Sequence, residues 1–354
     1  MKKRRAAAAA RALAAGAFLM ILPAGARAET PQTEDEKYRR AIDAAVDAGL
    51  EYLARVQLPD GSFPGMPMCN AVAALSVMAF LAKGHTPGHP PYGDNINRAI
   101  DFVLSTQQPD GTLIGPGGGQ MYSHNIACLM LSEVSGMVDA ARQERIRTVL
   151  SRALQVTLAA QKVQKPEAHR GGWRYAPNSG DSDLSHSGWA MMALRSARNA
   201  GMPVPREAVD DAVAFIKRCA CPDGGFAYQP GGGSGLARAG VGLLCLELSG
   251  EHRSEMAART AAYILQRIRQ GWGGEIFYYG SYYCAQGMFQ YGGREWEECA
   301  PLIYDTLLKL QAPDGSWNPM PGSPHEDGPG PAYRTAVAIL ALGVTYQQLP
   351  IYQR

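Results

Sequence analysis

Apolar residues are concentrated in six segments of the chain, and each segment ends on a glycine. The segments are 71–84, 126–136, 188–201, 240–250, 282–293 and 334–343. Glycine is favoured immediately after a helix because the backbone turns through positive φ there, where a Cβ is penalised. We therefore predict six helices that are apolar nearly all round and buried.

A more polar segment precedes each apolar one, and its apolar residues lie on one side. In the first of these segments, Ile42, Val46, Leu50 and Leu53 recur at helical spacing. The last apolar segment, 334–343, has no polar face that could cap an open solenoid. We therefore predict an all-α fold over residues 29–354: a closed α/α toroid of about six helical hairpins, with an inner and an outer ring of helices.

Three turns between paired helices share one sequence pattern. They read QLPDGSF at 57–63, QQPDGTL at 107–113 and QAPDGSW at 311–317. Proline blocks continuation of the helix, Asp-Gly favours a tight turn, and the glutamine side chain can bond helix-terminal backbone groups. We interpret these turns as structural rather than catalytic.

The N-terminus has the features of a secretory leader. A basic start, an apolar stretch from about Ala12 to Ala24 and a small-x-small site ending at Ala28 predict a signal peptide over residues 1–28. We therefore expect an exported protein, periplasmic or extracellular. The apolar stretch is too short to span a bilayer, so the mature chain is not expected to be an integral membrane protein.

Removal of this leader changes the charge balance. Without its six lysines and arginines, 28 basic residues face 32 acidic ones, a net charge of −4. A nucleic-acid partner is not expected, because binding of that kind needs a basic face.

The paired helices and their turns resemble the prenyltransferase and squalene-oxidase repeat of squalene-hopene cyclases and protein prenyltransferase β-subunits. The resemblance covers about residues 36–354 and implies an α/α toroid with QW-type turns. The segments GGWRYAPNSGDSDLSHSGWAMMALRSARNAG, CPDGGFAYQPGGGSG and FYYGSYYCAQGMFQYGG are similar to an exported bacterial group of such toroids. That similarity implies the fold and no particular substrate.

Asp181, Asp183 and His186 are the candidate catalytic residues. Squalene-hopene cyclases use an Asp-x-Asp-Asp run in which a protonated acid attacks an alkene. Such an acid needs a neighbouring hydrogen-bond donor and a dry pocket. Asp181 and Asp183 match the first two acids of that run, but Leu184 replaces the last, which argues against olefin protonation. The alternative is that Asp183 or Ser185 only caps the helix that follows.

Further side chains are expected around one mouth of a central cavity, where the inner helices begin. The aromatic cluster in FYYGSYYC could contact an apolar ligand or a carbocation through its π faces. Large aromatic side chains could equally fill the ring as core. The candidate binding residues are His124, Asn125, Arg238, Tyr278, Tyr279, Tyr282, Tyr283, Tyr333 and Arg334.

No metal or other cofactor is predicted. Protein prenyltransferases place an aspartate two residues before a zinc-binding cysteine, whereas Tyr282 stands two residues before Cys284. Cys219 and Cys221 lack nearby partners for a tetrahedral zinc site. None of the cysteines is followed three residues later by glutamine, which excludes an internal thioester of the Cys-x-x-Gln type.

Three classes of function follow from these patterns. The first is a terpenoid cyclase-like or prenyltransferase-like enzyme centred on Asp181 and Asp183. The second is a non-catalytic toroid that binds an apolar small molecule, a glycan or a protein. The third, less favoured, is a carbohydrate-active barrel of six helix pairs, which would need two carboxylates facing each other across a cleft.

Overall fold

The computed structural model describes residues 34–64, 68–116, 118, 120–325, 328 and 330–353. The predicted leader, residues 1–28, lies outside the described residues. Over the described ranges the chain forms twelve α-helices in six consecutive pairs. The outer helices are α1 (Glu34–Val56), α3 (Gly93–Ser105), α5 (Ala140–Lys162), α7 (Arg206–Arg218), α9 (Glu255–Gln270) and α11 (Gly293–Leu310). The inner helices are α2 (Cys69–Ala82), α4 (Gln120–Glu133), α6 (Leu184–Asn199), α8 (Leu236–Leu248), α10 (Phe277–Tyr291) and α12 (Gly330–Leu342).

The remaining elements are short. A two-stranded antiparallel hairpin pairs β1 (Phe226–Ala227) with β2 (Ser234–Gly235) just before α8. Three single-turn 3₁₀ helices complete the described elements, and they are η1 (Glu167–His169), η2 (Gly343–Tyr346) and η3 (Pro350–Tyr352).

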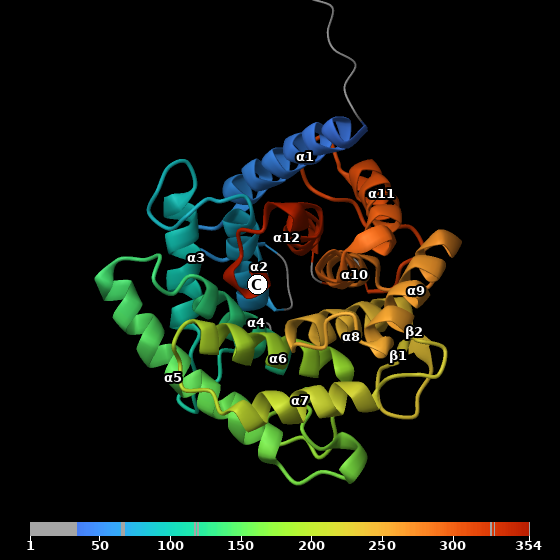
Figure 1. Cartoon of the computed structure of the whole chain (residues 1–354). Helices are drawn as coiled ribbons and strands as arrows, with labels where there is room; N and C mark the ends of the chain where they lie inside the picture. The colour runs from blue at the N-terminus through green and yellow to red at the C-terminus, as the bar shows by residue number, and fades with distance from the viewer. Residues whose placement is uncertain are drawn as a thin grey trace, which may run out of the picture.

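The helices form two concentric rings, as Figure 1 shows. Every residue of α2 is buried, in keeping with its apolar sequence. In the outer helix α3, by contrast, burial is confined to one face, on which Ile96, Ile100 and Val103 lie. The all-α toroid predicted from the apolar and one-sided segments is therefore confirmed.

The ring is closed, because the first and last helical pairs are in contact. Helix α12 packs on α2, and α1 packs on α11 and α12 (Figure 1). Across this seam the Gln311 side chain donates a hydrogen bond from Nε2 to the Ala45 carbonyl at 2.8 Å. The Tyr38 hydroxyl donates to Asp305 Oδ1 at 2.7 Å. Residues more than 250 positions apart in sequence thus meet as neighbours.

The glutamine of each repeated turn links one hairpin to the next. Gln311 Nε2 also donates to the Gly315 carbonyl at 3.2 Å, so it holds both its own turn and the following outer helix. The same double contact, to the turn and to the next outer helix, is made at three other turns by Gln57, Gln107 and Gln161. The structural interpretation of the turns agrees with this geometry.

The last described residues pack against the carboxyl ends of the inner helices, and Figure 1 shows this end of the chain near the centre of the ring. Ile351 and Tyr352 in η3 are buried. The Ile351 amide donates to Glu133 Oε2 at 3.1 Å, and Gln290 Nε2 donates to the Tyr352 carbonyl at 3.0 Å. The opposite end of the ring, where the inner helices begin, remains open to a cavity.

Within the described residues, no helix is both long enough and apolar enough to cross a bilayer.

Candidate functional site

A cavity of about 520 Å³ lies at the amino-terminal ends of the inner helices. Side chains of α4, α6, α8, α10 and α12 line it, together with Met68, which precedes α2. A volume of this size falls within the range of about 300–1,000 Å³ typical of small-molecule sites. The closed ring brings residues as far apart in sequence as Met68 and Tyr333 to one site.

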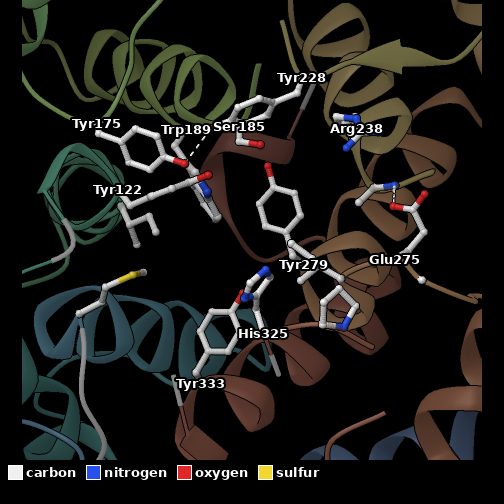
Figure 2. Close-up of a pocket in the computed structure, with 16 residues that line it drawn as sticks. Tyr122, Tyr175, Ser185, Trp189, Tyr228, Arg238, Glu275, Tyr279, His325 and Tyr333 are labelled. Atoms are coloured by element: carbon white, nitrogen blue, oxygen red, sulfur yellow. Dashed lines mark hydrogen bonds between the residues drawn. The ribbon is translucent and has the colours of Figure 1, made fainter. Parts of the chain in front are cut away.

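Six aromatic side chains form most of the cavity wall, and Figure 2 shows them around the open space. Four are on inner helices and two are in loops, and they are Tyr122, Tyr175, Trp189, Tyr228, Tyr279 and Tyr333. The two loop tyrosines are tied together by a hydrogen bond of 2.9 Å between their hydroxyls. Aromatic faces are apolar but electron-rich, so this wall suits an unsaturated or cationic ligand better than a fully hydrated one.

Charged side chains line the cavity mainly on one side. Arg238 and Glu275 lie near each other in Figure 2. Arg238 Nε donates to the Phe226 carbonyl at 3.4 Å. The Glu275 carboxylate accepts the Leu236 amide at 2.9 Å and the Ala237 amide at 3.4 Å, so it caps the amino terminus of α8. His325 adds an imidazole to the lining.

Three hydroxyl groups gather on another part of the wall. They belong to Tyr122 on α4, Ser185 on α6 and Tyr279 on α10. Burial raises the pKa of both tyrosines well above the ordinary value near 10, while the nearby Ser185 hydroxyl has a smaller, opposing effect. Both phenols therefore stay protonated and can donate hydrogen bonds throughout the physiological pH range.

Asp183 and His186 are in direct contact, but neither is among the residues that line the cavity. Asp183 is completely buried, and its Oδ1 accepts the His186 amide at 2.9 Å as the N-cap of α6. Its Oδ2 lies 2.8 Å from His186 Nδ1. The imidazole packs against two cavity tyrosines, with ring centroids 3.8 Å from Tyr122 and 4.4 Å from Tyr175. The Asp183–His186 pair thus stands directly behind the aromatic wall.

Asp181 has a different environment. Its side chain is 43% exposed and lies 3.2 Å from Arg174 Nη1 and 3.0 Å from Gln229 Nε2. The guanidinium of Arg174 lies over the rings of Tyr175 and Tyr228, at 5.3 and 5.5 Å from their centroids. Asp181 therefore supports the loop side of the cavity through Arg174, and it does not line the cavity itself.

His124 and Asn125 face the outer ring. His124 Nδ1 accepts the Leu113 amide at 3.0 Å, and its Nε2 lies 3.1 Å from the Ala153 carbonyl of α5. Burial lowers the pKa of His124 to about 4, so the ring is neutral at physiological pH. Asn125 Oδ1 accepts a hydrogen bond from Thr157 at 3.0 Å. Both side chains join α4 to α5 and lie outside the cavity lining.

The remaining predicted residues are divided between the cavity and the core. Arg238, Tyr279 and Tyr333 line the cavity. The others are buried elsewhere: Tyr278 bonds the Asn318 carbonyl, Tyr282 the Tyr352 hydroxyl and Arg334 the Trp317 carbonyl, and Tyr283 packs edge-on against Trp189. Both uses expected for the aromatic cluster, ligand contact and core filling, thus occur within one helix.

Sequence reasoning missed several lining residues. Ser185 and Trp189 lie one helical turn apart in α6, immediately after the Asp183 cap. Tyr175 and Tyr228 lie in loops that precede inner helices. Their position, within nine residues of the start of an inner helix, is the signal that could have found them.

Metal-ligating side chains do not converge in the part of the chain that the structure describes, where no group of three or more His, Cys, Asp or Glu residues could hold an ion. All seven cysteines are free thiols, and six of them are buried. Burial raises the pKa of Cys128, Cys245 and Cys284 above the ordinary thiol value, which disfavours the thiolate that metal binding requires.

Comparisons with known proteins agree with this architecture. Over 196 residues the chain is 26% identical to a drimenyl diphosphate synthase of Streptomyces showdoensis, a match that covers 55% of this chain and 33% of that relative. The apo structure of the type II terpene cyclase MstE from Scytonema superposes with a TM-score of 0.57 at 14% identity, covering 88% of this chain and 100% of that one.

A helical barrel from a different enzyme class is similar too. An inactive variant of an α-1,6-mannanase of Salegentibacter sp. HEL1_6, in complex with α-1,6-mannotetrose, has a TM-score of 0.64 at 10% identity, over 87% of this chain and 99% of that one. At these identities the structural likeness concerns the fold alone. The model of the prenyltransferase alpha-alpha toroid domain matches residues 9–145 and 92–276, which together span more than half of the sequence. The chain therefore belongs to the prenyltransferase alpha-alpha toroid domain family.

Proposed function

We propose that this protein is an exported toroid that binds an isoprenoid chain in its aromatic cavity. The main support for the proposal is the wall of five tyrosines and one tryptophan around a cavity of about 520 Å³. Alkenes and apolar chains pack well against such π faces, which also tolerate developing positive charge. Similarity to a drimenyl diphosphate synthase supports an isoprenoid as the ligand class.

Cyclisation of that ligand is the second candidate function. It is favoured by the Asp183–His186 pair, whose imidazole packs 3.8 Å from the cavity tyrosine Tyr122. Alkene protonation would need Asp183 to reach the ligand, yet Asp183 does not line the cavity and its carboxylate oxygens face the amide and the imidazole of His186. Binding without protonation is therefore the function that the geometry supports best.

A glycosidase function is not favoured by the cavity. Glycoside hydrolysis needs two carboxyl groups about 5–10 Å apart across the bond that breaks. Among the described residues that line the cavity, Glu275 supplies the one carboxylate, and its oxygens accept the first amides of α8.

Direct binding measurements test the proposal. Titration of the mature chain with farnesol should give saturable binding, and Trp189→Leu should weaken it about tenfold or more, because the residue supplies an aromatic face to the cavity. Trp296→Leu on outer helix α11 is the matched control and should bind as the wild type does. Absence of saturable binding, or equal weakening in both variants, would overturn the proposal. Circular dichroism should show that both variants are folded.

A separate test addresses catalysis. Incubation of the mature chain with farnesol, farnesyl diphosphate and longer prenyl homologues, followed by mass spectrometry, would detect any cyclised product. A product that Asp183→Asn abolishes would establish cyclisation and displace binding as the main function. Unchanged ligands, recovered from a protein that binds them saturably, are the expected result.

Export is proposed from the leader sequence. Cells that express the full chain should yield a stable protein that begins at Glu29 and is recovered outside the cytoplasm. An intact Met1 on a purely cytoplasmic product would contradict export without touching the binding proposal.

A further inference from the structure

Tyr279 occupies a distinctive place in the cavity. Its side chain comes from the first turn of α10, and Figure 2 shows it projecting into the middle of the space with its hydroxyl toward Ser185. The hydroxyl oxygen is buried and makes no hydrogen bond of normal geometry to another described residue. The packing of the ring against Tyr283, at 4.9 Å between centroids, fixes the direction in which the hydroxyl points.

The buried Tyr279 hydroxyl favours a ligand that carries a hydrogen-bond acceptor. Nearly all buried polar groups in proteins make a hydrogen bond, because leaving one unmade is costly. The Tyr279 phenol stays protonated, since burial raises its pKa, so it offers a donor. A pure hydrocarbon has no oxygen that could accept a hydrogen bond from the Tyr279 hydroxyl.

Charge argues that the matching ligand group is neutral. The lining arginine, Arg238, lies on the side of the cavity that also carries the Glu275 carboxylate (Figure 2). Arg174 is behind the aromatic wall, where it is paired with Asp181. The hydroxyl cluster itself offers donors without a cation, which suits an alcohol, ether or carbonyl oxygen better than a phosphate.

We propose, resting on the isoprenoid-binding function above, that the cavity selects an uncharged, oxygenated isoprenoid whose oxygen accepts a hydrogen bond from Tyr279. The prenyl chain of the ligand lies against Trp189 and the other aromatic side chains. Tyr279 is therefore the specificity-determining residue, and the aromatic wall supplies most of the affinity for the prenyl chain.

The experiment compares farnesol with farnesene, a hydrocarbon of the same chain length. Dissociation constants are measured by tryptophan fluorescence for the wild type, Tyr279→Phe and Tyr283→Phe. Tyr283 is the matched control, because it is a fully buried tyrosine on the same helix whose side chain does not line the cavity. The wild type should prefer farnesol about 3- to 10-fold, the range expected for one neutral hydrogen bond.

The variants then separate the possible outcomes. Tyr279→Phe should bind farnesene as tightly as the wild type and lose the preference for farnesol, whereas Tyr283→Phe should keep it. Equal wild-type affinities for the two probes, or a preference that survives Tyr279→Phe, would overturn the assignment of Tyr279 and leave isoprenoid binding intact. Tighter wild-type binding of farnesyl diphosphate than of farnesol would overturn the neutral ligand class. Failure of the wild type to bind any probe would instead remove the proposed function itself.

Discussion

The Gln311 side chain should stabilise the contact between the first and last helical pairs, and Gln311→Ala tests this. The substitution removes two hydrogen bonds, one of 2.8 Å to Ala45 on α1 and one of 3.2 Å to Gly315 in the same turn. Other contacts at the seam remain, among them the Arg55 guanidinium bound to the Asp314 carbonyl at 2.9 Å. The variant should therefore weaken the seam and leave the ring able to close.

The magnitude follows from the number and setting of the two bonds. A neutral hydrogen bond contributes a net of about 0.5–1.5 kcal/mol, so two contribute about 1–3 kcal/mol. The side chain is only partly buried, and water can replace some of what it provides. We expect a loss in the free energy of unfolding in the lower half of that range, about 1–2 kcal/mol.

Urea unfolding followed by circular dichroism measures this loss, and hydrogen exchange in α1 localises it. Gln108→Ala is the matched control, since that side chain bonds the carbonyls of Thr106 and Ile114 within its own turn and links no helices. The control should leave exchange in α1 unchanged, whereas Gln311→Ala should accelerate it. If Gln311→Ala left both the free energy of unfolding and hydrogen exchange in α1 unchanged, the role of Gln311 in stabilising the closed ring would be refuted.

Three further predictions concern stability. Burial raises the pKa of Glu133 from 4.5 to about 7, so the stability associated with its protonated form is present below pH 4.5 and lost as the pH rises through 7. The loss should be on the order of 3 kcal/mol and absent in Glu133→Gln, as urea unfolding at pH 5 and pH 8 would show. Asp183→Ala should lower the free energy of unfolding by about 1 kcal/mol through loss of the α6 cap, whereas Asp183→Asn should lower it less. A reversed order of the two variants in thermal unfolding would contradict the capping role. Trp317→Ala should cost about 3–5 kcal/mol in urea unfolding, because the indole is fully buried in a repeated turn; a loss below 1 kcal/mol would contradict this packing role.

The fold could be predicted from the sequence because each of its repeats carries the same physical pattern. An all-apolar segment such as α2 has no face that tolerates water, whereas one-sided α3 must lie between core and solvent. Helix starts were less predictable, since α12 begins at Gly330, before its apolar run, and its first turn carries the cavity residue Tyr333. The equivalent role of Gln161 was not predicted, because ten residues separate it from its turn partner Gly171, whereas four separate the partners in the other turns.

The site was less predictable, because its residues come together only when the ring closes. Arg238, Tyr279 and Tyr333 were found from the expectation that inner helices begin at one mouth. Neither the Asp183–His186 contact nor the orientation of Tyr278 and Tyr282 away from the cavity can be read from spacing alone. Which face of an inner helix meets the cavity depends on how the neighbouring helices pack.

A crystal structure of residues 29–354 with farnesol would decide whether the aromatic cavity holds an isoprenoid. We expect ligand density between Trp189 and Tyr279, with the ligand oxygen within hydrogen-bond distance of the Tyr279 hydroxyl. An empty cavity in crystals grown at saturating farnesol, or density for farnesol elsewhere on the molecule, would contradict it.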